Sequence, residues 1–262
     1  DRAGGVLCVF LLNKFFFSLS VNSFVLFFSK GFIIFDFIFI LLLLFLIPNR
    51  VSAQNETDFG GMLTAEYQCG FANLYEVWVK EDLRFDHDFS QYTRSKTALG
   101  FDYKFKKYRL LHGLKMGIAV EYINKYTEKH IYRNRYRFSA HFTYKYDYRN
   151  WEFAFRTRYQ MMMHDETRGY YNYKMQHVWR NRLSVEYRGK NSRWSYGLSG
   201  ELIAETKGKD LFLESILLVG SVDYRLTRRQ YLSVFVRDYR DIYITDDQIR
   251  TVFFGLGWKF KH

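Results

Sequence analysis

Seven arginines recur at every second position in three stretches of this chain. A β-strand places every second side chain on one face, so each stretch would present its arginines together. The guanidinium group is planar and permanently charged, and it binds a carboxylate or phosphate through two parallel hydrogen bonds. The spacing therefore predicts an anion-binding surface on neighbouring strands. Its members are Arg133, Arg135, Arg137, Arg156, Arg158, Arg180 and Arg182.

Carboxylates fall on the same predicted faces and could neutralise these arginines. The shortest hairpin registers place Arg137 opposite Arg158, which is a repulsive pair. The next hairpin places Arg180 opposite Glu201, which is an attractive pair. The acidic partners expected on this face are Glu76, Asp82, Glu121, Glu152, Glu186, Glu201 and Glu205.

The segment from Ile131 to Tyr146 shows most clearly which elements must carry these side chains. One of its faces is rich in Tyr and Phe, and the other carries arginines, small polar residues and a lysine. Alternation with a period of two residues indicates a β-strand with one apolar and one polar face. Ten such strands are expected from Asn73 onward, at residues 73–85, 92–105, 114–126, 131–146, 151–161, 173–188, 194–206, 212–226, 230–240 and 249–260.

The connections between these predicted strands alternate in length. Bacterial outer-membrane barrels have short periplasmic turns and longer extracellular loops, and in lipid a strand protein can span only as a closed barrel. We therefore expect an all-β fold, an antiparallel transmembrane β-barrel of about 10 strands (10–12) in the outer membrane of a Gram-negative cell. Short turns are expected at 106–108, 147–149, 189–192 and 227–229, and longer loops at 86–91, 124–130, 162–172, 206–210 and 241–248.

The alternative is a secreted soluble β-barrel or sandwich whose apolar faces point inward. About ten aromatic-rich rows exceed the volume of a small barrel core, which favours the membrane barrel. The last predicted strand supports the membrane barrel, because aromatic and aliphatic residues occupy every second position from Val252 to Phe260, close to the C-terminus. Such a strand resembles the signal that barrel assembly machinery reads. The expected partners are therefore this machinery, outer-membrane lipids and lipopolysaccharide.

The N-terminal segment has a continuous apolar stretch in place of the alternating pattern found in the rest of the chain. An apolar stretch from Gly31 to Ile47 follows Lys30 and precedes the small residues Val51 and Ala53. This order is typical of a signal peptide, with a membrane anchor as the alternative. We expect residues 1–29 to be non-native sequence translated from upstream of the true start codon. A signal peptide is expected at 30–53, an N-terminal segment or first strand at 54–72, and the barrel at 73–262.

Several short strings in the barrel segment resemble a known family. In their order and spacing they are similar to the outer-membrane barrels of Bacteroidota grouped as domain of unknown function 2490, DUF2490, over about residues 58 to 261. This chain has Tyr136 where that family has a histidine. The resemblance implies the fold and the location, and it supplies no catalytic residues. The strings are Glu81-Asp82-Leu83-Arg84, Asn134-Arg135-Tyr136-Arg137-Phe138, Arg158-Tyr159-Gln160, Arg180-Asn181-Arg182-Leu183, Val185-Glu186-Tyr187 and Asp238-Tyr239-Arg240.

Composition narrows the functional classes. The chain of 262 residues is 48% apolar, 21% aromatic and 25% charged, with a net charge of +12, which excludes a disordered chain, a collagen and a coiled coil. Two cysteines, Cys8 and Cys69, cannot make a disulfide framework, and no metal-ligand spacing occurs. Arginines on strand faces of a membrane barrel also argue against nucleic-acid binding. No cofactor and no metal site are expected.

Three functions remain open. The inward charges could pair across a filled lumen, giving a structural or plugged barrel, or they could line a small anion-selective pore. The third is an outer-membrane hydrolase, in which Asp86-His87-Asp88 or His164-Asp165-Glu166 on outer loops would supply a general base. No nucleophile motif accompanies these triplets, so an enzyme is the less favoured class and no catalytic residue is assigned.

Overall fold

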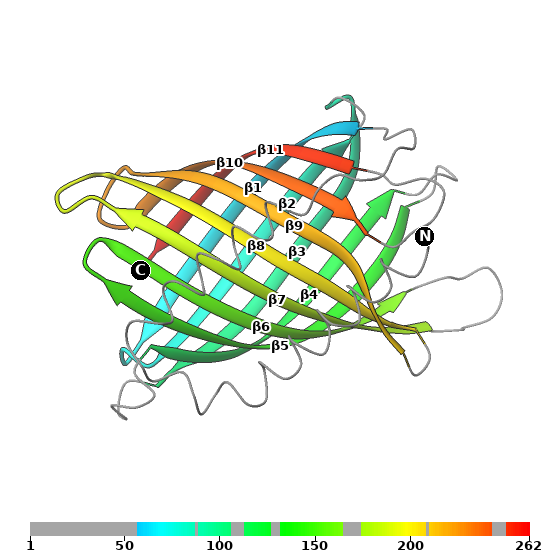
Figure 1. The fold of residues 1–262 in the computed structure, drawn as a ribbon, viewed down its shortest axis with the longest axis horizontal. Helices are drawn as coiled ribbons and strands as arrows, with labels where there is room; N and C mark the ends of the chain where they lie inside the picture. The colour runs from blue at the N-terminus through cyan, green and yellow to red at the C-terminus, as the bar shows by residue number, and fades with distance from the viewer. Residues whose placement is uncertain are drawn as a thin grey trace, which may run out of the picture. The chain divides into compact units, whose positions relative to one another are not determined.

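Eleven strands form one closed barrel (Figure 1). The structure, a computed structural model, describes residues 57–86, 89–105, 113–126, 132–164, 174–207, 210–242 and 250–262. Within these ranges no helix is long and apolar enough to cross a membrane. The predicted all-β barrel is confirmed. Its strands are β1 (Thr57–Phe71), β2 (Tyr75–Asp86), β3 (Gln91–Lys104), β4 (Leu114–Tyr126), β5 (Tyr132–Tyr148), β6 (Trp151–His164), β7 (Lys174–Arg188), β8 (Trp194–Lys207), β9 (Asp210–Arg225), β10 (Gln230–Asp241) and β11 (Arg250–Lys261).

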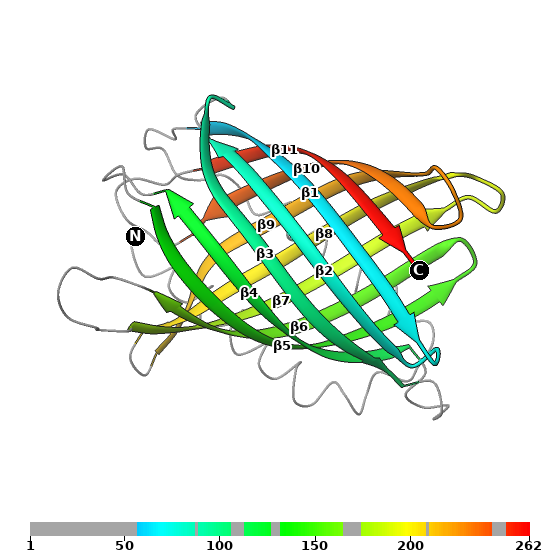
Figure 2. The same cartoon turned by 180° about the vertical axis from the view of Figure 1, so that it is seen from behind.

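The barrel closes between its first and last strands. Each strand pairs with the next one in an antiparallel ladder, whereas β1 and β11 pair in parallel, from Thr57 opposite Arg250 to Gln68 opposite Lys261. An odd number of alternating strands requires this parallel pair, because the first and eleventh strands run in the same direction. Figure 2 shows the two strands side by side at the closure. The leader predicted at residues 1–53 lies outside the described residues.

Successive side chains point alternately out of and into the barrel. On β4, for example, Ile118 is 63% exposed on the outside, whereas Ala119, Glu121 and Ile123 are buried on the inside. The faces predicted for the segment from Ile131 to Tyr146 and for the last strand are as expected. Aromatic pairs such as Trp194 and Tyr224, with ring centroids 4.6 Å apart, lie on the outer face near the strand ends.

The connections only partly follow the predicted difference in length between the two rims. On the rim that carries the C-terminus, residues 72–74, 149–150, 189–193 and 226–229 are short connections, but the turn predicted at 106–108 occupies 105–113. On the opposite rim, 165–173 and 242–249 are long, whereas the loop predicted at 206–210 is reduced to 208–209. The strand pairing of β8 and β9 continues to Lys207 opposite Asp210, which leaves only these two residues to turn the chain.

Candidate functional site

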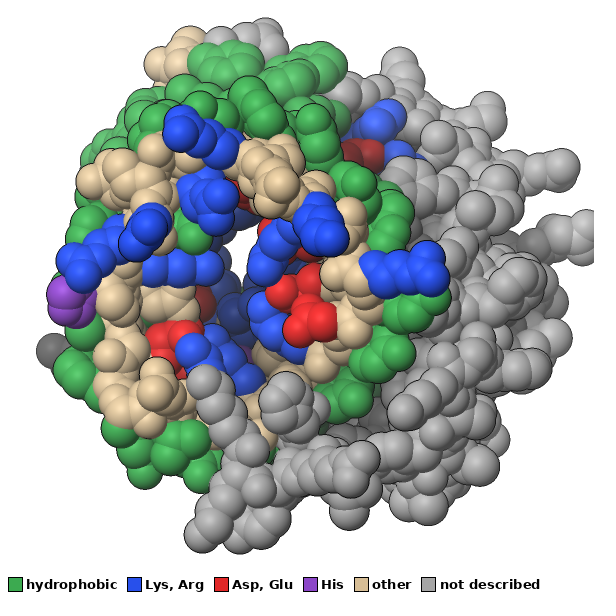
Figure 3. Space-filling view, turned by 90° about the vertical axis from the view of Figure 1, so that its left-hand side faces the viewer, with side chains coloured by type: hydrophobic (Ala, Val, Ile, Leu, Met, Phe, Trp, Pro, Cys, Tyr) green, Lys and Arg blue, Asp and Glu red, His purple; other side chains and the backbone are tan. Residues whose placement is uncertain are grey.

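Many charged side chains of the described residues converge in the interior of the barrel. Figure 3 looks into the end that carries the C-terminus, and it shows a central opening lined by Lys, Arg, Asp and Glu, with hydrophobic side chains around the outside. One level of charge lies near the C-terminal rim, and a second lies near the middle of the strands. Further inward cations, among them Arg94, Lys125 and Arg135, lie toward the opposite rim.

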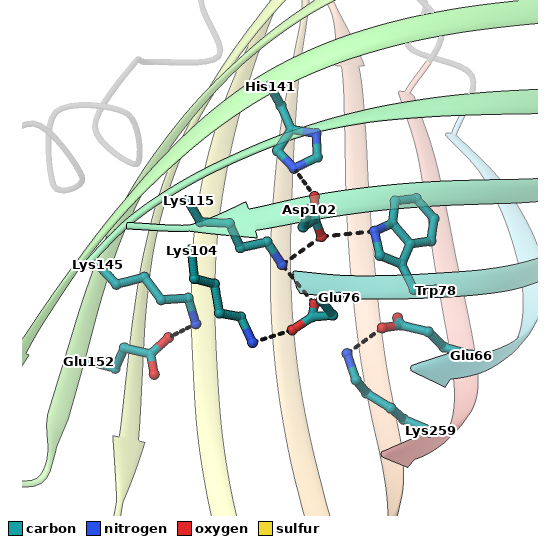
Figure 4. Close-up of polar contacts among 10 residues, drawn as sticks. All are labelled: Glu66, Glu76, Trp78, Asp102, Lys104, Lys115, His141, Lys145, Glu152 and Lys259. Carbon is teal, nitrogen blue, oxygen red and sulfur yellow. Dashed lines mark hydrogen bonds and ion pairs between the residues drawn. The ribbon is translucent and has the colours of Figure 1, made fainter. Parts of the chain in front are cut away.

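Near the C-terminal rim, five inward cations pair with carboxylates (Figure 4), whereas a sixth, Lys261, lies over the Tyr231 ring. We call this set the rim ion pairs. The five cations of these pairs meet four carboxylates, and Asp102 adds a fifth, so the paired charges join neighbouring strands of the wall with equal numbers of both signs. The pairs are Lys104–Glu76 at 2.5 Å, Lys115–Glu76 at 2.8 Å, Lys145–Glu152 at 2.5 Å, Arg188–Glu186 at 2.8 Å, Arg188–Glu152 at 3.1 Å and Lys259–Glu66.

Asp102 on β3 is the hub of this level. Its carboxylate accepts a hydrogen bond from Trp78 Nε1 at 2.9 Å, and it lies 2.7 Å from Lys115 Nζ and 2.9 Å from His141 Nε2 (Figure 4). His141 lies two strands away on β5, so the contact passes over Gly117 of β4. A Cβ at Gly117 would overlap the Asp102 carboxylate and come within 2.8 Å of the His141 ring, so only glycine permits this contact.

The second level, which we call the central belt, is built around three buried carboxylates. Asp82, Glu121 and Glu201 are 1%, 2% and 3% exposed. A fourth, Glu214 from β9, lies within electrostatic range of Arg137. Eight cations surround the three buried carboxylates, and even with Glu214 they outnumber the acids two to one. They are Lys80, Lys96, Arg137, Arg156, Arg158, Arg180, Arg182 and Arg237.

Direct ion pairs satisfy only part of this belt. Arg137 Nη1 lies 2.9 Å from Glu121, and Arg180 Nε lies 2.7 Å from Glu201. By contrast, Arg158 is 3.9 Å from Glu121, at the outer limit of an ion pair. In Arg158 the Nε atom is buried without a hydrogen-bond partner among the described residues. The belt therefore holds more guanidinium donors than its carboxylates can accept.

The predicted cross-strand partners are wrong, although the predicted faces are right. Arg137 lies opposite Met162, because the turn to β6 is centred on residues 149–150, later than expected. In the next hairpin Arg182, and not Arg180, lies opposite Glu201, because the turn extends over 189–193. The attraction between Arg180 and Glu201 is nevertheless present, as a diagonal ion pair.

The structure brings five of the seven predicted arginines into the central belt. The other two, Arg133 and Arg135, lie toward the opposite rim, where they face Lys125 and Ile123 of β4. The prediction missed Lys80, Lys96 and Arg237. The alternating pattern of their strands placed each of them on the polar face, and assigning faces to every predicted strand would have found them.

The predicted acidic residues divide between the two levels. Glu76, Glu152 and Glu186 belong to the rim ion pairs, and Asp82, Glu121 and Glu201 belong to the central belt. Glu205 is half-buried near the far end of β8, opposite Val178.

Of the two triplets considered for hydrolysis, only the ends lie in the described part of the chain. Asp86 ends β2 and pairs with Arg84 at 2.7 Å, and His164 is the last residue of β6. The remaining residues, His87, Asp88, Asp165 and Glu166, lie outside the described residues. The described ranges contain no group of three or more His, Cys, Asp or Glu side chains placed to hold a metal ion.

Sequence comparison matches this chain to no family model and to no curated protein. Among solved structures, the chain is similar to the NanC porin in a rhombohedral crystal form, with 13% identity and a TM-score of 0.49 over 78% of this chain and 99% of that one. It is also similar to an anion-selective porin from Comamonas acidovorans, with 7% identity and a TM-score of 0.35 over 71% and 54% of the two chains. Identities this low concern barrel architecture alone.

Proposed function

We propose that this protein is an outer-membrane β-barrel that passes small anionic solutes through its arginine-lined interior. The observation that carries the proposal is the surplus of cations in the central belt, where eight Lys and Arg side chains meet three buried carboxylates and Glu214. A channel lined by one sign of charge concentrates ions of the other sign and repels its own. Rings of Arg and Lys are the arrangement that favours anions.

The outer surface supports the membrane part of this proposal. Large apolar side chains such as Ile118, Val120, Val234 and Leu256 are exposed along the outside of the barrel. In water this much exposed apolar surface would favour association, whereas in lipid it is the surface expected of a spanning barrel. The closed ladder also leaves no sheet edge unpaired, which lipid requires.

A sealed, structural barrel is the second candidate, and the rim ion pairs favour it. Together with Asp102 their charges balance, and they join strands around the interior, so that level could block the path as well as line it. The opening in Figure 3 favours the pore, because the view along the barrel shows side chains arranged around a space that they do not fill.

Single-channel recording distinguishes the two candidates. The full chain is folded into a planar bilayer between chambers of unequal KCl concentration. A pore gives discrete current steps, and its anion selectivity is reduced in the Arg158→Ala variant. Protein that is shown to be folded but conducts no current would support the sealed barrel and overturn the proposed passage.

A further inference from the structure

Two arginines of the central belt make no direct ion pair with a carboxylate among the described residues. Arg182 on β7 donates from Nη2 to Ser199 Oγ at 2.8 Å, which is a neutral partner. Arg237 on β10 has its guanidinium carbon 4.6 Å from the centre of the Phe235 ring, and its Nη1 lies 3.6 Å from Met62 Sδ. The direct contacts of both side chains are therefore with neutral groups, and their nearest acids, Glu201 for Arg182 and Asp82 for Arg237, act only from beyond ion-pair distance.

The local packing explains how Arg237 is positioned without a direct ion pair. Phe235 lies opposite Gly255 of β11, and a Cβ at Gly255 would overlap its ring, so the ring lies flat against the barrel wall. Phe253 and Met62 complete this buried apolar cluster. A guanidinium that stacks on an aromatic face keeps its N–H donors directed sideways and available.

A third guanidinium lies beside them. Arg156 on β6 lies directly opposite Arg182 and is 3.9 Å from Glu201, the nearest acid to it. Arg182 is within electrostatic range of both Arg156 and Arg237. The Nε atoms of Arg156 and Arg237 are buried and have no hydrogen-bond partner among the described residues. Arg156 and Arg237 thus both act electrostatically on Arg182, and each of the two has an unused donor.

We propose that Arg156, Arg182 and Arg237 form a discrete binding site for a divalent oxyanion, such as the phosphate group of a small solute. This inference rests on the proposed function and names its solute class. A carboxylate carries one negative charge and two acceptor oxygens, so it would leave most of the positive charge unbalanced. A phosphate group carries up to two charges, and its three or more oxygens can accept bidentate hydrogen bonds from several guanidinium groups. The Ser199 hydroxyl adds a further donor.

Isothermal titration of the full chain, folded in detergent micelles, with inorganic phosphate tests the site. We expect saturable binding that chloride or acetate at equal concentration does not reproduce. Arg182→Gln and Arg237→Gln should each weaken phosphate binding about tenfold or more, because each removes a charge-assisted contact. Arg250→Gln is the matched control, since Arg250 lies on the outer side and pairs with Asp238; it should bind phosphate as the wild type does.

Each outcome bears on a different claim. Wild-type protein without saturable phosphate binding overturns the site, and so do Arg182→Gln and Arg237→Gln variants that bind phosphate as tightly as wild type. If phosphate binding fails in either way but the same preparation gives anion-selective current, the proposed anion passage stands and only the phosphate site is overturned. If phosphate binds but no current flows, the site stands and the passage fails. Circular dichroism of each variant establishes that it retains the β-barrel.

Discussion

Arg156 on β6 and Arg182 on β7 lie directly opposite each other in the barrel wall. Arg158 and Arg180 form a second pair of the same kind one step along the same ladder. Like charges at facing positions of a β-ladder are destabilising, so this arrangement opposes folding. A barrel selected only for stability would place an acid or a neutral residue at one position of each pair. The facing arginine pairs are explained if their positive charge serves the proposed passage of anions.

Replacing Arg158 with glutamine should therefore stabilise the barrel while weakening its function. We expect Arg158→Gln to raise the free energy of unfolding by about 0.5 kcal/mol, because it removes a charge that faces Arg180 and whose nearest carboxylate, Glu121, is 3.9 Å away. Urea unfolding in lipid vesicles measures this change. A loss of stability would mean that the arginine is needed to hold the wall together.

Removing a buried acid should have the opposite effect. Glu201 is 3% exposed and pairs with Arg180 at 2.7 Å, so Glu201→Gln leaves that arginine without its partner. We expect a loss on the order of 3 kcal/mol in the free energy of unfolding. Glu205→Gln on the same strand is the control and should cost less, since Glu205 is only half-buried. Equal effects of the two changes would contradict the role given to Glu201.

The side-chain faces could be predicted from the sequence because alternation has a period of two, and the structure keeps the predicted faces from Tyr132 to Tyr146. The partners across the ladder could not. A turn that is centred one or two residues away from its predicted place slides the register by two or four positions. An even shift preserves the faces and changes every facing pair. The assumed position of the turn therefore gave Arg137 the wrong neighbour, whereas the structure shows Met162.

The eleventh strand was ambiguous in the sequence for a different reason. The segment Thr57–Phe71 adds an eleventh strand to the ten expected from Asn73 onward, and bacterial single-chain barrels have even strand numbers. Only the pairing of this segment with β11 on one side and β2 on the other places it in the wall. Arg237 was missed because its role depends on Phe235 and Met62, which are brought beside it by pairing across three strands.

Gly117 should be required for the contact between Asp102 and His141. Gly117→Ala would force a Cβ against the Asp102 carboxylate, and we expect a loss of about 1–3 kcal/mol in the free energy of unfolding. Gly220→Ala is a matched control, because a Cβ there meets nothing within 4 Å. Thermal unfolding in the same detergent compares the two. Similar midpoints for both variants would show that the contact does not depend on a glycine.

An arginine placed on the outer face should report whether that face meets lipid. Val120 lies at the middle of β4 and Met175 is the second residue of β7, and both are exposed. In a bilayer Val120→Arg should cost about 2–4 kcal/mol and Met175→Arg no more than about 1 kcal/mol. Unfolding in lipid vesicles measures both. Two equally small costs would indicate that the outer face lies in water.

The most direct test of the central claim is the reversal potential of the open barrel across a KCl gradient. The full chain in a planar bilayer should give a potential whose sign shows chloride passing more readily than potassium. The double variant Arg182→Gln/Arg237→Gln should move this potential toward zero, because the belt loses two of its eight cations. A potential of the opposite sign, or one that the double variant leaves unchanged, would contradict an anion passage controlled by the central belt.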